Sequence, residues 1–220
     1  MELIRHVLEQ GRQVILLIPE IALTYQNVSR FYARFGEQVS LIHSRMSQGE
    51  RYDQFERAKE GKISVMIGPR SALFTPFPRL GLILIDEEHE DSYKSEKTPC
   101  YHARETAIQR GKMEGAFVVM GSASPSVESY YKAETGAYRL VRLEQRYGGS
   151  TLPDVSIVDL REELKTGNRS VFSGLLTRKI QERLKKKEQV ILFLNRRGYS
   201  GFVTCRSCGH VMKCPHCDVS

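Results

Sequence analysis

The sequence lacks an apolar run long enough to cross a lipid bilayer. Its longest apolar runs, residues 14–18 and 80–85, are far shorter than the roughly 20 residues that a membrane-spanning helix requires. The N-terminus also lacks the basic flank, the apolar stretch and the cleavage site of an export signal. These absences predict a cytoplasmic protein without a membrane partner.

The composition is that of an ordinary soluble globular protein. Of the 220 residues, 40% are hydrophobic and 27% are charged, which argues against disorder over most of the length. The net charge of +7 favours an anionic partner such as nucleic acid or a nucleotide, although charge alone is weak evidence for either.

Continuous apolar runs alternate with helical stretches along the chain. Continuous rather than alternating hydrophobicity is typical of strands that are covered on both faces in a parallel sheet. The predicted strands are residues 13–18, 38–42, 63–67, 81–85 and 117–120, and the predicted helices include residues 1–10, 22–35 and 49–60. Because strands that alternate with helices form βαβ units, the predicted fold class is α/β.

A turn-rich segment, residues 146–153, is predicted to lead into a second unit. Beyond it we expect a short strand at residues 155–158, a charged loop at 161–169, a helix at 174–187 and a strand at 190–194. The last helix and strand weakly repeat the pattern of residues 4–19, in which an amphipathic helix leads through a polar turn into a buried strand. Duplication of an α/β lobe would explain the repeat, and so would chance similarity between two common units.

The segment that ends in Asp86-Glu87-Glu88-His89 is the strongest indication of chemistry. An apolar strand leads directly into it, and this places adjacent carboxylates at the sheet edge where ligands bind in open α/β folds. Hydrolysis of a nucleoside triphosphate needs one carboxylate to hold Mg²⁺ and another to orient or deprotonate the attacking water. Asp86 fits the first role and Glu87 the second, while His89 is placed to sense the γ-phosphate. The alternative is that these residues only solvate the end of a strand.

A site for Mg²⁺ and ATP also requires a phosphate loop, Gly-x-x-x-x-Gly-Lys-[Ser/Thr], at the start of a helix. The sequence contains no such loop. Because residues 1–10 form a helical stretch that leads straight into a strand, we expect that the chain begins just after the missing loop. It is then a fragment that does not hydrolyse ATP alone.

Two cysteine pairs, Cys205-Arg-Ser-Cys208 and Cys214-Pro-His-Cys217, have the spacing of zinc-thiolate knuckles. Without an export signal, metal ligands or free thiols are favoured over a disulfide framework, and the remaining Cys100 is interpreted as a free thiol. A redox dithiol is the competing interpretation of a single Cys-x-x-Cys. The short spacer between the pairs favours one zinc ion for each pair, completed by ligands that this chain does not contain.

Six short motifs follow one another along the chain. They are Pro19-Glu-Ile-Ala-Leu-Thr24, His43-Ser-Arg-Met-Ser47, Gly68-Pro-Arg-Ser-Ala-Leu-Phe74, Asp86-Glu-Glu-His89, Gly121-Ser-Ala-Ser-Pro125 and Asn195-Arg-Arg-Gly198. In this order they resemble the helicase motifs of the primosomal protein N′ (PriA) family, and the resemblance covers essentially the whole chain. It implies a superfamily 2 motor with RecA-like lobes that uses ATP and Mg²⁺ to move along DNA.

The same resemblance assigns roles to polar loop residues. Thr24 and Arg70 would lie on loops that grip the backbone of single-stranded DNA, for which a hydroxyl and a guanidinium are suitable ligands. Ser122 and Ser124 resemble the Ser-Ala-Thr motif that links hydrolysis to strand movement. Without the resemblance, all four would be interpreted as ordinary turn or loop residues.

Residues 90–105 interleave aromatic and basic side chains. Bases stack on aromatic rings while cations contact phosphates, at about 1–3 kcal/mol per stacked base. The segment resembles the aromatic-rich loop that couples DNA contact to ATP hydrolysis in related helicases, and its predicted DNA-binding residues are Tyr93, Lys94, Tyr101 and Arg104. The alternative is a solvated surface loop.

The PriA family also carries an insertion in its second lobe, in which eight cysteines bind two zinc ions. By resemblance, Cys205 and Cys208 would serve one ion, and Cys214 and Cys217 the other. With half of each ligand set present, we expect the chain to bind zinc weakly, sub-stoichiometrically or not at all.

The predicted organisation is a RecA-like helicase lobe at residues 1–148, the start of a second RecA-like lobe at 149–204, and a truncated Cys-rich zinc module at 205–220. The first lobe would have a parallel sheet with helices on both faces. The resemblance implies an ATP-dependent 3′→5′ DNA helicase that recognises stalled or abandoned replication forks and helps to reload the replicative helicase. Its implied partners are single-stranded and forked DNA, primosome proteins and single-stranded DNA-binding protein. Two alternatives stay open: a catalytically dead module that binds nucleic acid or a protein partner, and another superfamily 2 DNA translocase.

Overall fold

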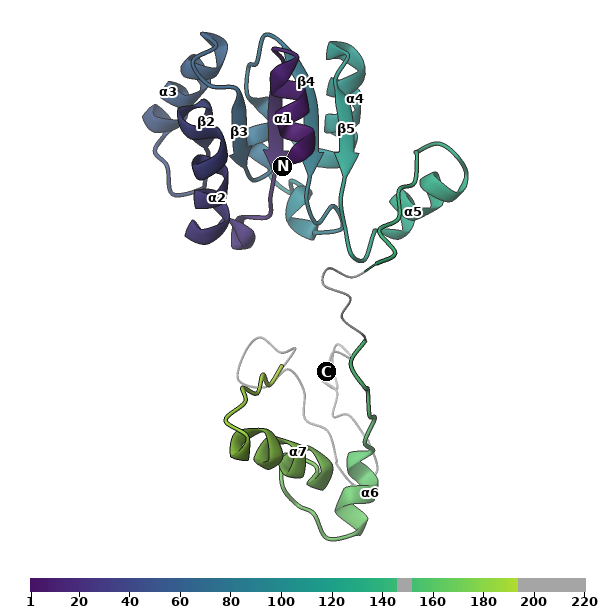
Figure 1. Cartoon of the computed structure of the whole chain (residues 1–220). Helices are drawn as coiled ribbons and strands as arrows, with labels where there is room; N and C mark the ends of the chain where they lie inside the picture. The colour runs from purple at the N-terminus through teal and green to yellow at the C-terminus, as the bar shows by residue number, and fades with distance from the viewer. Residues whose placement is uncertain (146–151, 194–220) are drawn as a thin grey trace. The chain divides into compact units, whose positions relative to one another are not determined.

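The computed structural model describes residues 1–145 and 152–193, and the chain divides into two units, Met1–Arg142 and Leu143–Ser220 (Figure 1). These are called the first unit and the second unit below. The predicted domain boundaries after residues 148 and 204 stay predictions.

The first unit is built on a five-stranded, fully parallel sheet with the strand order β2-β3-β1-β4-β5. The strands are β1 (Gln13–Leu17), β2 (Val39–Leu41), β3 (Val65–Gly68), β4 (Leu80–Ile85) and β5 (Phe117–Met120). Each overlaps a predicted strand, so the predicted α/β fold with a parallel sheet is confirmed. β1 lies at the centre, where Leu16 is aligned with Ile67 of β3 on one side and with Leu84 of β4 on the other.

Helices cover both faces of this sheet (Figure 1). They are α1 (Glu2–Glu9) and α2 (Tyr25–Phe35) on one face, and α3 (Gln48–Lys59) and α4 (Ala103–Glu114) on the other, while α5 (Val127–Glu134) follows β5. Successive side chains of a strand point to opposite faces. Val14 and Leu16 of β1 accordingly join the apolar cluster with α1 and α2, whereas Ile15 and Leu17 join the cluster with α3 and α4.

Local sequence signals account for where these elements begin and end. Ser47 starts α3 with a capping box, because its hydroxyl accepts the N–H of Glu50 at 3.2 Å while the Glu50 carboxylate accepts the N–H of Ser47 at 2.7 Å. Gly11, between α1 and β1, has a φ of +68°, a left-handed conformation that glycine adopts without a steric cost.

Loops gather where the parallel strands end. Short 3₁₀ helices follow β1, β3 and β4, at Glu20–Ala22, Arg70–Phe74 and Asp91–Tyr93, and a fourth, Gly36–Gln38, precedes β2. Since all the strands run in the same direction, the motif-bearing loops after β1, β3, β4 and β5 lie at the same edge of the sheet. Ligands bind at this edge in open α/β folds.

β5 forms an open border of the sheet. It pairs with β4, and no other strand of residues 1–145 or 152–193 pairs with its second edge. Phe117 is 75% exposed and Val119 is 38% exposed, although both belong to an apolar run that was predicted to be buried. The other two β5 residues, Val118 and Met120, pack partly against the core.

The described part of the second unit contains two helices, α6 (Leu160–Lys165) and α7 (Gly174–Lys185). The loop predicted at residues 161–169 was therefore wrong in part, since α6 occupies residues 160–165. Asp159 caps this helix, because its carboxylate accepts the N–H of Arg161 at 2.8 Å. The predicted helix at 174–187 is confirmed.

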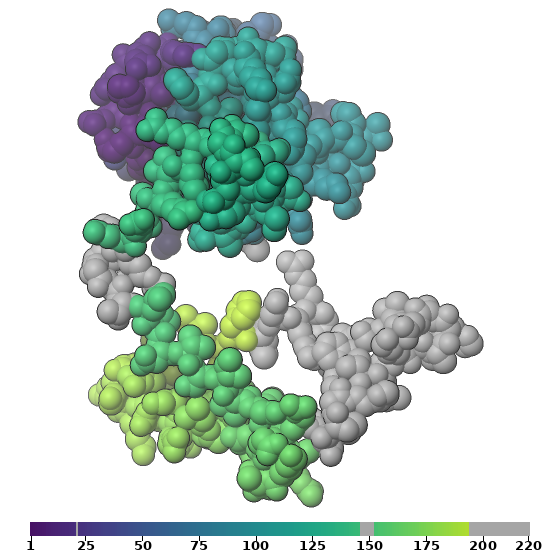
Figure 2. Space-filling model, turned by 90° about the vertical axis from the view of Figure 1, so that its right-hand side faces the viewer, coloured from purple at the N-terminus to yellow at the C-terminus, as the bar shows by residue number. Residues whose placement is uncertain are grey.

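The strands predicted at residues 155–158 and 190–194 are not formed within residues 152–193. A strand needs a neighbour that accepts and donates its backbone hydrogen bonds, and the described residues of this unit supply none. Only Ser173 is buried between residues 152 and 193. Figure 2 shows this segment in green to yellow. This segment has no apolar core of its own.

Residues 146–151 and 194–220 lie outside the described residues. The motif at residues 195–198 and the predicted zinc ligands Cys205, Cys208, Cys214 and Cys217 fall there, so the structure does not test them. Among the helices of the described ranges, none is long and apolar enough to cross a membrane.

Candidate active site

The acidic box, defined as Asp86, Glu87, Glu88 and His89, follows β4 directly. Asp86 continues the alignment of β4 with β1, because its N–H donates to the carbonyl of Leu17 at 2.9 Å. Asp86 is exposed, and the side chain of Glu87 is 44% exposed. Two carboxylates thus face solvent at the end of a buried central strand.

Glu87 adopts a left-handed backbone conformation with a φ of +47°. Such a conformation costs a residue other than glycine about 1–3 kcal/mol and persists only where its surroundings impose it. The carboxylate of Asp86 accepts the N–H of Glu87 at 3.1 Å, and the carbonyl of Gly121 accepts the N–H of Glu88 at 3.1 Å. The chain is therefore held on both sides of Glu87, and the turn leaves Glu87 partly exposed while Glu88 is buried.

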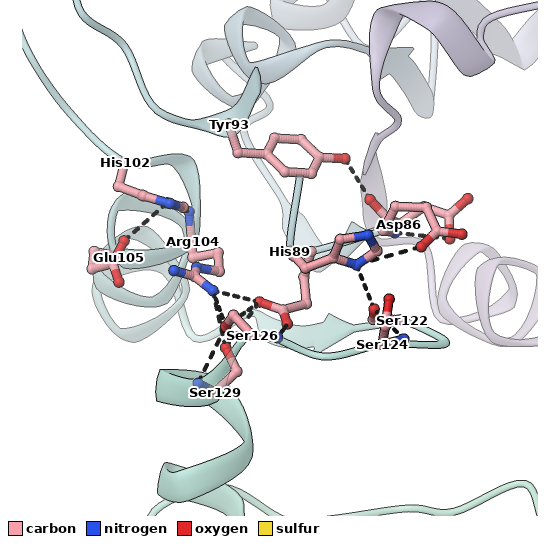
Figure 3. Close-up of polar contacts among 12 residues, drawn as sticks. Asp86, His89, Tyr93, His102, Arg104, Glu105, Ser122, Ser124, Ser126 and Ser129 are labelled. Atoms are coloured by element: carbon pink, nitrogen blue, oxygen red, sulfur yellow. Dashed lines mark hydrogen bonds and ion pairs between the residues drawn. The ribbon is translucent and has the colours of Figure 1, made fainter. Parts of the chain in front are cut away.

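His89 connects the acidic box to the SAS segment, defined as residues 121–125. Its Nδ1 lies 2.6 Å from the hydroxyl of Ser122 (Figure 3) and 3.6 Å from the carboxylate of Glu87. The hydroxyl of Ser122 in turn accepts the N–H of Ser124 at 3.0 Å. One imidazole therefore joins the residue predicted to act in hydrolysis with the two serines predicted to couple hydrolysis to movement.

Tyr93 lies in the core beside Asp86 of the acidic box (Figure 3). It is 1% exposed, and its hydroxyl donates to backbone carbonyls, at 2.6 Å from the carbonyl oxygen of Asp86 and 3.1 Å from that of Leu17. Burial, together with the neighbouring carboxylates, raises the pKa of Tyr93 far above its usual value, so the hydroxyl stays a donor. The predicted stacking of DNA bases on Tyr93 does not fit this buried position.

Glu88 is the buried member of the acidic box, at 2% exposed. Its carboxylate accepts the N–H of Ser126 at 2.6 Å, the hydroxyl of Ser129 at 2.9 Å and Nη1 of Arg104 at 2.7 Å. Burial by itself raises the pKa of Glu88, but these hydrogen bonds outweigh it and hold the pKa below the usual value. Glu88 is therefore a stable carboxylate at neutral pH.

Arg104, the second residue of α4, has a side chain that is only 11% exposed. Its Nη1 contacts Ser126 and Ser129 (Figure 3), and it also contacts Glu88 inside the protein. The predicted contact of Arg104 with DNA does not fit this arrangement, because the guanidinium is committed to a buried carboxylate.

The loops that follow β3 and β4 are joined to each other. Nη1 of Arg70 donates to the carbonyl of Ser92 at 3.0 Å and also to that of Lys94. The half-buried ring of Tyr101 meets Phe74 edge-to-face, with ring centroids 5.2 Å apart. Because Lys94 is exposed and Phe74 is 50% exposed, the joined loops present a basic and an aromatic group to solvent.

Thr24 lies on the loop after β1, where it begins α2. Its hydroxyl accepts the N–H of Asn27 at 3.4 Å, and the residue is exposed. The backbone N–H groups at a helix N-terminus attract anions. This position is compatible with the predicted phosphate contact of Thr24.

Comparison with known protein families finds a match over more than half of the chain. A family model described as DEAD/DEAH box helicase matches residues 1–133. The chain belongs to this family. The matched range contains both the acidic box and the SAS segment.

Curated relatives place the chain more closely within the helicases. It is 52% identical over 217 residues to the replication restart protein PriA of Bacillus subtilis, and 48% identical over 214 residues to that of Chlamydia pneumoniae. These alignments cover 99% and 96% of the chain, which confirms the predicted resemblance to the PriA family. The chain spans only 27% and 29% of the length of these two relatives.

Solved structures of similar fold are more distant. The C-terminal domain of Dbp5 from S. cerevisiae aligns with 64% of this chain and 80% of its own, with 15% sequence identity and a TM-score of 0.42. A likeness of this degree supports no functional comparison.

Membership of a helicase family implies the use of ATP and Mg²⁺. In proteins, Mg²⁺ in nucleotide sites keeps several waters and takes one or two carboxylates, so it needs no full protein cage. Residues 1–145 and 152–193 contain no group of three or more His, Cys, Asp or Glu side chains placed to hold a metal. The exposed carboxylate of Asp86 fits such an ion, whereas the sequence supplies no phosphate loop for the nucleotide.

Sequence reasoning missed the cluster around Glu88. Ser126 follows Pro125 and precedes a helical stretch, which is a signal for a helix N-cap, and it does cap α5. Nothing in the sequence shows that Glu88 is buried, because it lies between two other polar residues, Glu87 and His89. In the structure both of these neighbours are partly exposed.

Proposed function

We propose that this chain forms part of an ATP-dependent 3′→5′ DNA helicase that acts at stalled or abandoned replication forks. The observation that carries the proposal is the bridge from Glu87 through His89 to Ser122. A solvated strand end has no need of such a bridge, whereas a motor must link its hydrolysis site to the segment that moves. The names of the PriA relatives support replication restart as the biological role.

The chemistry assigned to the acidic box needs two carboxylates with separate tasks. Bound Mg²⁺ would neutralise charge on the phosphates. Asp86 would hold this ion directly or through its water shell, and Glu87 would orient the attacking water and accept its proton. His89 lies between Glu87 and Ser122, where it would report the state of the nucleotide to the SAS segment.

The DNA-binding surface that we propose uses four of the predicted residues. Thr24 at the start of α2 and Lys94 on the exposed loop would contact phosphates, and Tyr101 with its neighbour Phe74 would meet a base. Arg70 would contribute to the same surface by holding together the loops that follow β3 and β4. Contacts to phosphates and ring faces do not depend on the base sequence, as a motor requires.

The remaining parts of the proposal depend on the longer protein. Recognition of forks, reloading of the replicative helicase and binding of primosome proteins and single-stranded DNA-binding protein are proposed from the resemblance to PriA. Two zinc ions held in part by Cys205, Cys208, Cys214 and Cys217 belong to the same proposal.

DNA-stimulated ATP hydrolysis tests the proposal most directly. We would compare this chain with the longer protein encoded by its natural reading frame, and substitute Glu87→Gln in the longer protein. We expect hydrolysis only in the longer protein, and a loss on the order of a thousandfold with Glu87→Gln because the base for the water is gone. Asp91→Asn, an exposed acidic neighbour, is the matched control and should keep activity.

A different result would favour a module that only binds. If the longer protein binds single-stranded DNA but hydrolyses no ATP, the acidic box has no catalytic role and the helicase proposal is wrong. Equal activity of Glu87→Gln and Asp91→Asn would remove Glu87 from the mechanism.

A further inference from the structure

Glu88 is the member of the acidic box to which the proposed function gives no role. Its side chain is buried, while the carboxylate of Glu87 is 44% exposed. A buried carboxylate is costly unless it is paired and hydrogen-bonded. All the groups that satisfy it come from outside the box, namely Arg104 at the start of α4 and two serines at the start of α5.

These contacts determine the position of α5. The helix contains no buried residue, so apolar packing does not hold it against the sheet. Ser126 caps it by accepting the N–H of Ser129 at 3.3 Å, and the Ser126 hydroxyl donates to Glu88 at 3.2 Å. With the backbone N–H of Ser126 also bound, Glu88 is the main anchor of the start of α5.

Glu88 also holds the opposite end of the SAS segment. Its backbone N–H donates to the carbonyl of Gly121 at 3.1 Å, and the N–H of Gly121 donates to Ile85 at 2.8 Å. Glu88 therefore contacts both ends of the SAS segment, through its backbone at Gly121, the first residue of the segment, and through its side chain at Ser126, the residue that directly follows it. Between these anchors, Ser122 meets His89.

Arg104 keeps the anchor charged and in place. Its Nη1 reaches Glu88 and both serines, whereas its Nε has no hydrogen-bond partner among the described residues. The guanidinium is thus oriented by the cluster. A positive charge at this point also favours the ionised form of Glu88.

We propose that Glu88 and Arg104 are a pair of positioning residues that fasten both ends of the SAS segment to the acidic box. Movement at Glu87 and His89 is then transmitted to the SAS segment and to α5 as one connected piece. This inference rests on the proposed function, because it assigns the pair to the coupling of hydrolysis with DNA movement. Neither residue touches the nucleotide or the DNA in this role.

The test uses the longer protein from the natural reading frame, with Glu88→Gln, Arg104→Gln and the double substitution. The measurements are KM for ATP, the DNA-stimulated kcat, and the number of base pairs separated per ATP hydrolysed. We expect KM to stay within about threefold, because ground-state binding is untouched. Base pairs separated per ATP should fall about tenfold, which is less than the loss of about a hundredfold that a displacement of about 1 Å can cause.

Two further variants separate coupling from a general loss of structure. Arg12→Gln is the matched control, because Arg12 is also a partly buried arginine, and it binds the carbonyls of Leu80 and Gly115 at the opposite edge of the sheet from the acidic box. It should leave the yield per ATP unchanged. Ser129→Ala removes only part of the anchor, so it should lower the yield in the same direction but by less than Glu88→Gln.

The double substitution tests whether the two residues act as a unit. If they do, the double variant should lose little more than either single variant. Losses that multiply, or a yield per ATP that is unchanged in Glu88→Gln, would overturn the inference. The proposed function fails separately, if Glu87→Gln retains full ATP hydrolysis.

Discussion

Residues 4–17 and 180–193 share a sequence pattern but differ in structure. In both, an amphipathic helix is followed by a polar turn and the apolar run Gln-Val-Ile-Leu. In the first unit the run forms β1, and Ile15 is 0% exposed. In the second unit the same run follows α7, forms no strand, and leaves Ile191 92% exposed.

The difference shows that neighbours decide whether such a run becomes a strand. β1 is aligned with β3 and β4 on its two sides and is covered by helices on both faces. Residues 190–193 have none of these partners within the described part of the chain. An apolar run supplies the capacity for a strand, and the rest of the sheet supplies the hydrogen bonds and the burial.

The largest expected difference between the two apolar runs is in the rate of amide hydrogen exchange. Exchange in β1 requires unfolding of the core, which costs about 5–15 kcal/mol in typical domains. We therefore expect the β1 amides to exchange at least about a thousandfold more slowly than an unstructured peptide, while residues 190–193 exchange at nearly the peptide rate. Mass spectrometry of this chain measures both runs in one experiment. Similar protection in both would show that the second run is paired in solution.

The same substitution at two equivalent positions gives the next largest contrast. Ile15→Ala should lower the free energy of unfolding by about 2–5 kcal/mol, because it leaves a cavity in a packed core. Ile191→Ala should change it by less than about 0.5 kcal/mol, as for exposed residues. Far-UV circular dichroism during urea unfolding is the measurement, since the chain has no tryptophan to report by fluorescence. Equal shifts of the urea midpoint would contradict the comparison.

Lowering the pH should produce a third and smaller difference between the two units, in how their stability depends on a carboxylate. The pKa of Glu88 is lowered in the folded first unit from a usual value of 4.5, so its contribution is present above that pH and is lost as the pH falls through the folded pKa. Glu88→Gln should therefore destabilise the first unit at pH 7, and its difference from the unsubstituted chain should shrink below about pH 4.5.

The matched control lies in the second unit. The exposed ion pair with Arg161 lowers the pKa of Asp159 to about 2, but solvent and salt screen such a pair. Asp159→Asn should leave the unfolding of the first unit unchanged at every pH. A pH-independent difference for Glu88→Gln would mean that the buried ion pair does not contribute through its charge.

Continuous apolar runs predicted the sheet of the first unit, because strands that are buried on both faces are apolar at successive positions. The five strands were placed to within about two residues, the usual limit for element boundaries. The Asp-Glu-Glu-His and Gly-Ser-Ala-Ser-Pro motifs also marked the groups that the structure joins through His89. Their roles in catalysis and coupling stay predictions.

The sequence did not predict which side chains of the site point into the protein and which point to solvent. Tyr93 and Arg104 belong to an aromatic and basic stretch that is typical of a nucleic-acid surface, yet both turn inward. Glu87 adopts a left-handed conformation directly before the buried Glu88, and no residue type signals this conformation, since glycine is absent there. The two strands predicted at residues 155–158 and 190–194 are not formed within residues 152–193 for a different reason, because pairing partners cannot be deduced from a single apolar run.

The open border of β5 has a consequence for how this chain behaves in solution. Among the described residues, the second edge of β5 has no strand partner, and the exposed ring of Phe117 belongs to this strand. Such an edge is a template on which another strand can pair. Folding within one molecule is first order in protein, whereas edge-to-edge pairing is second order. A low protein concentration therefore favours the monomer, and we expect a high protein concentration to favour association through β5.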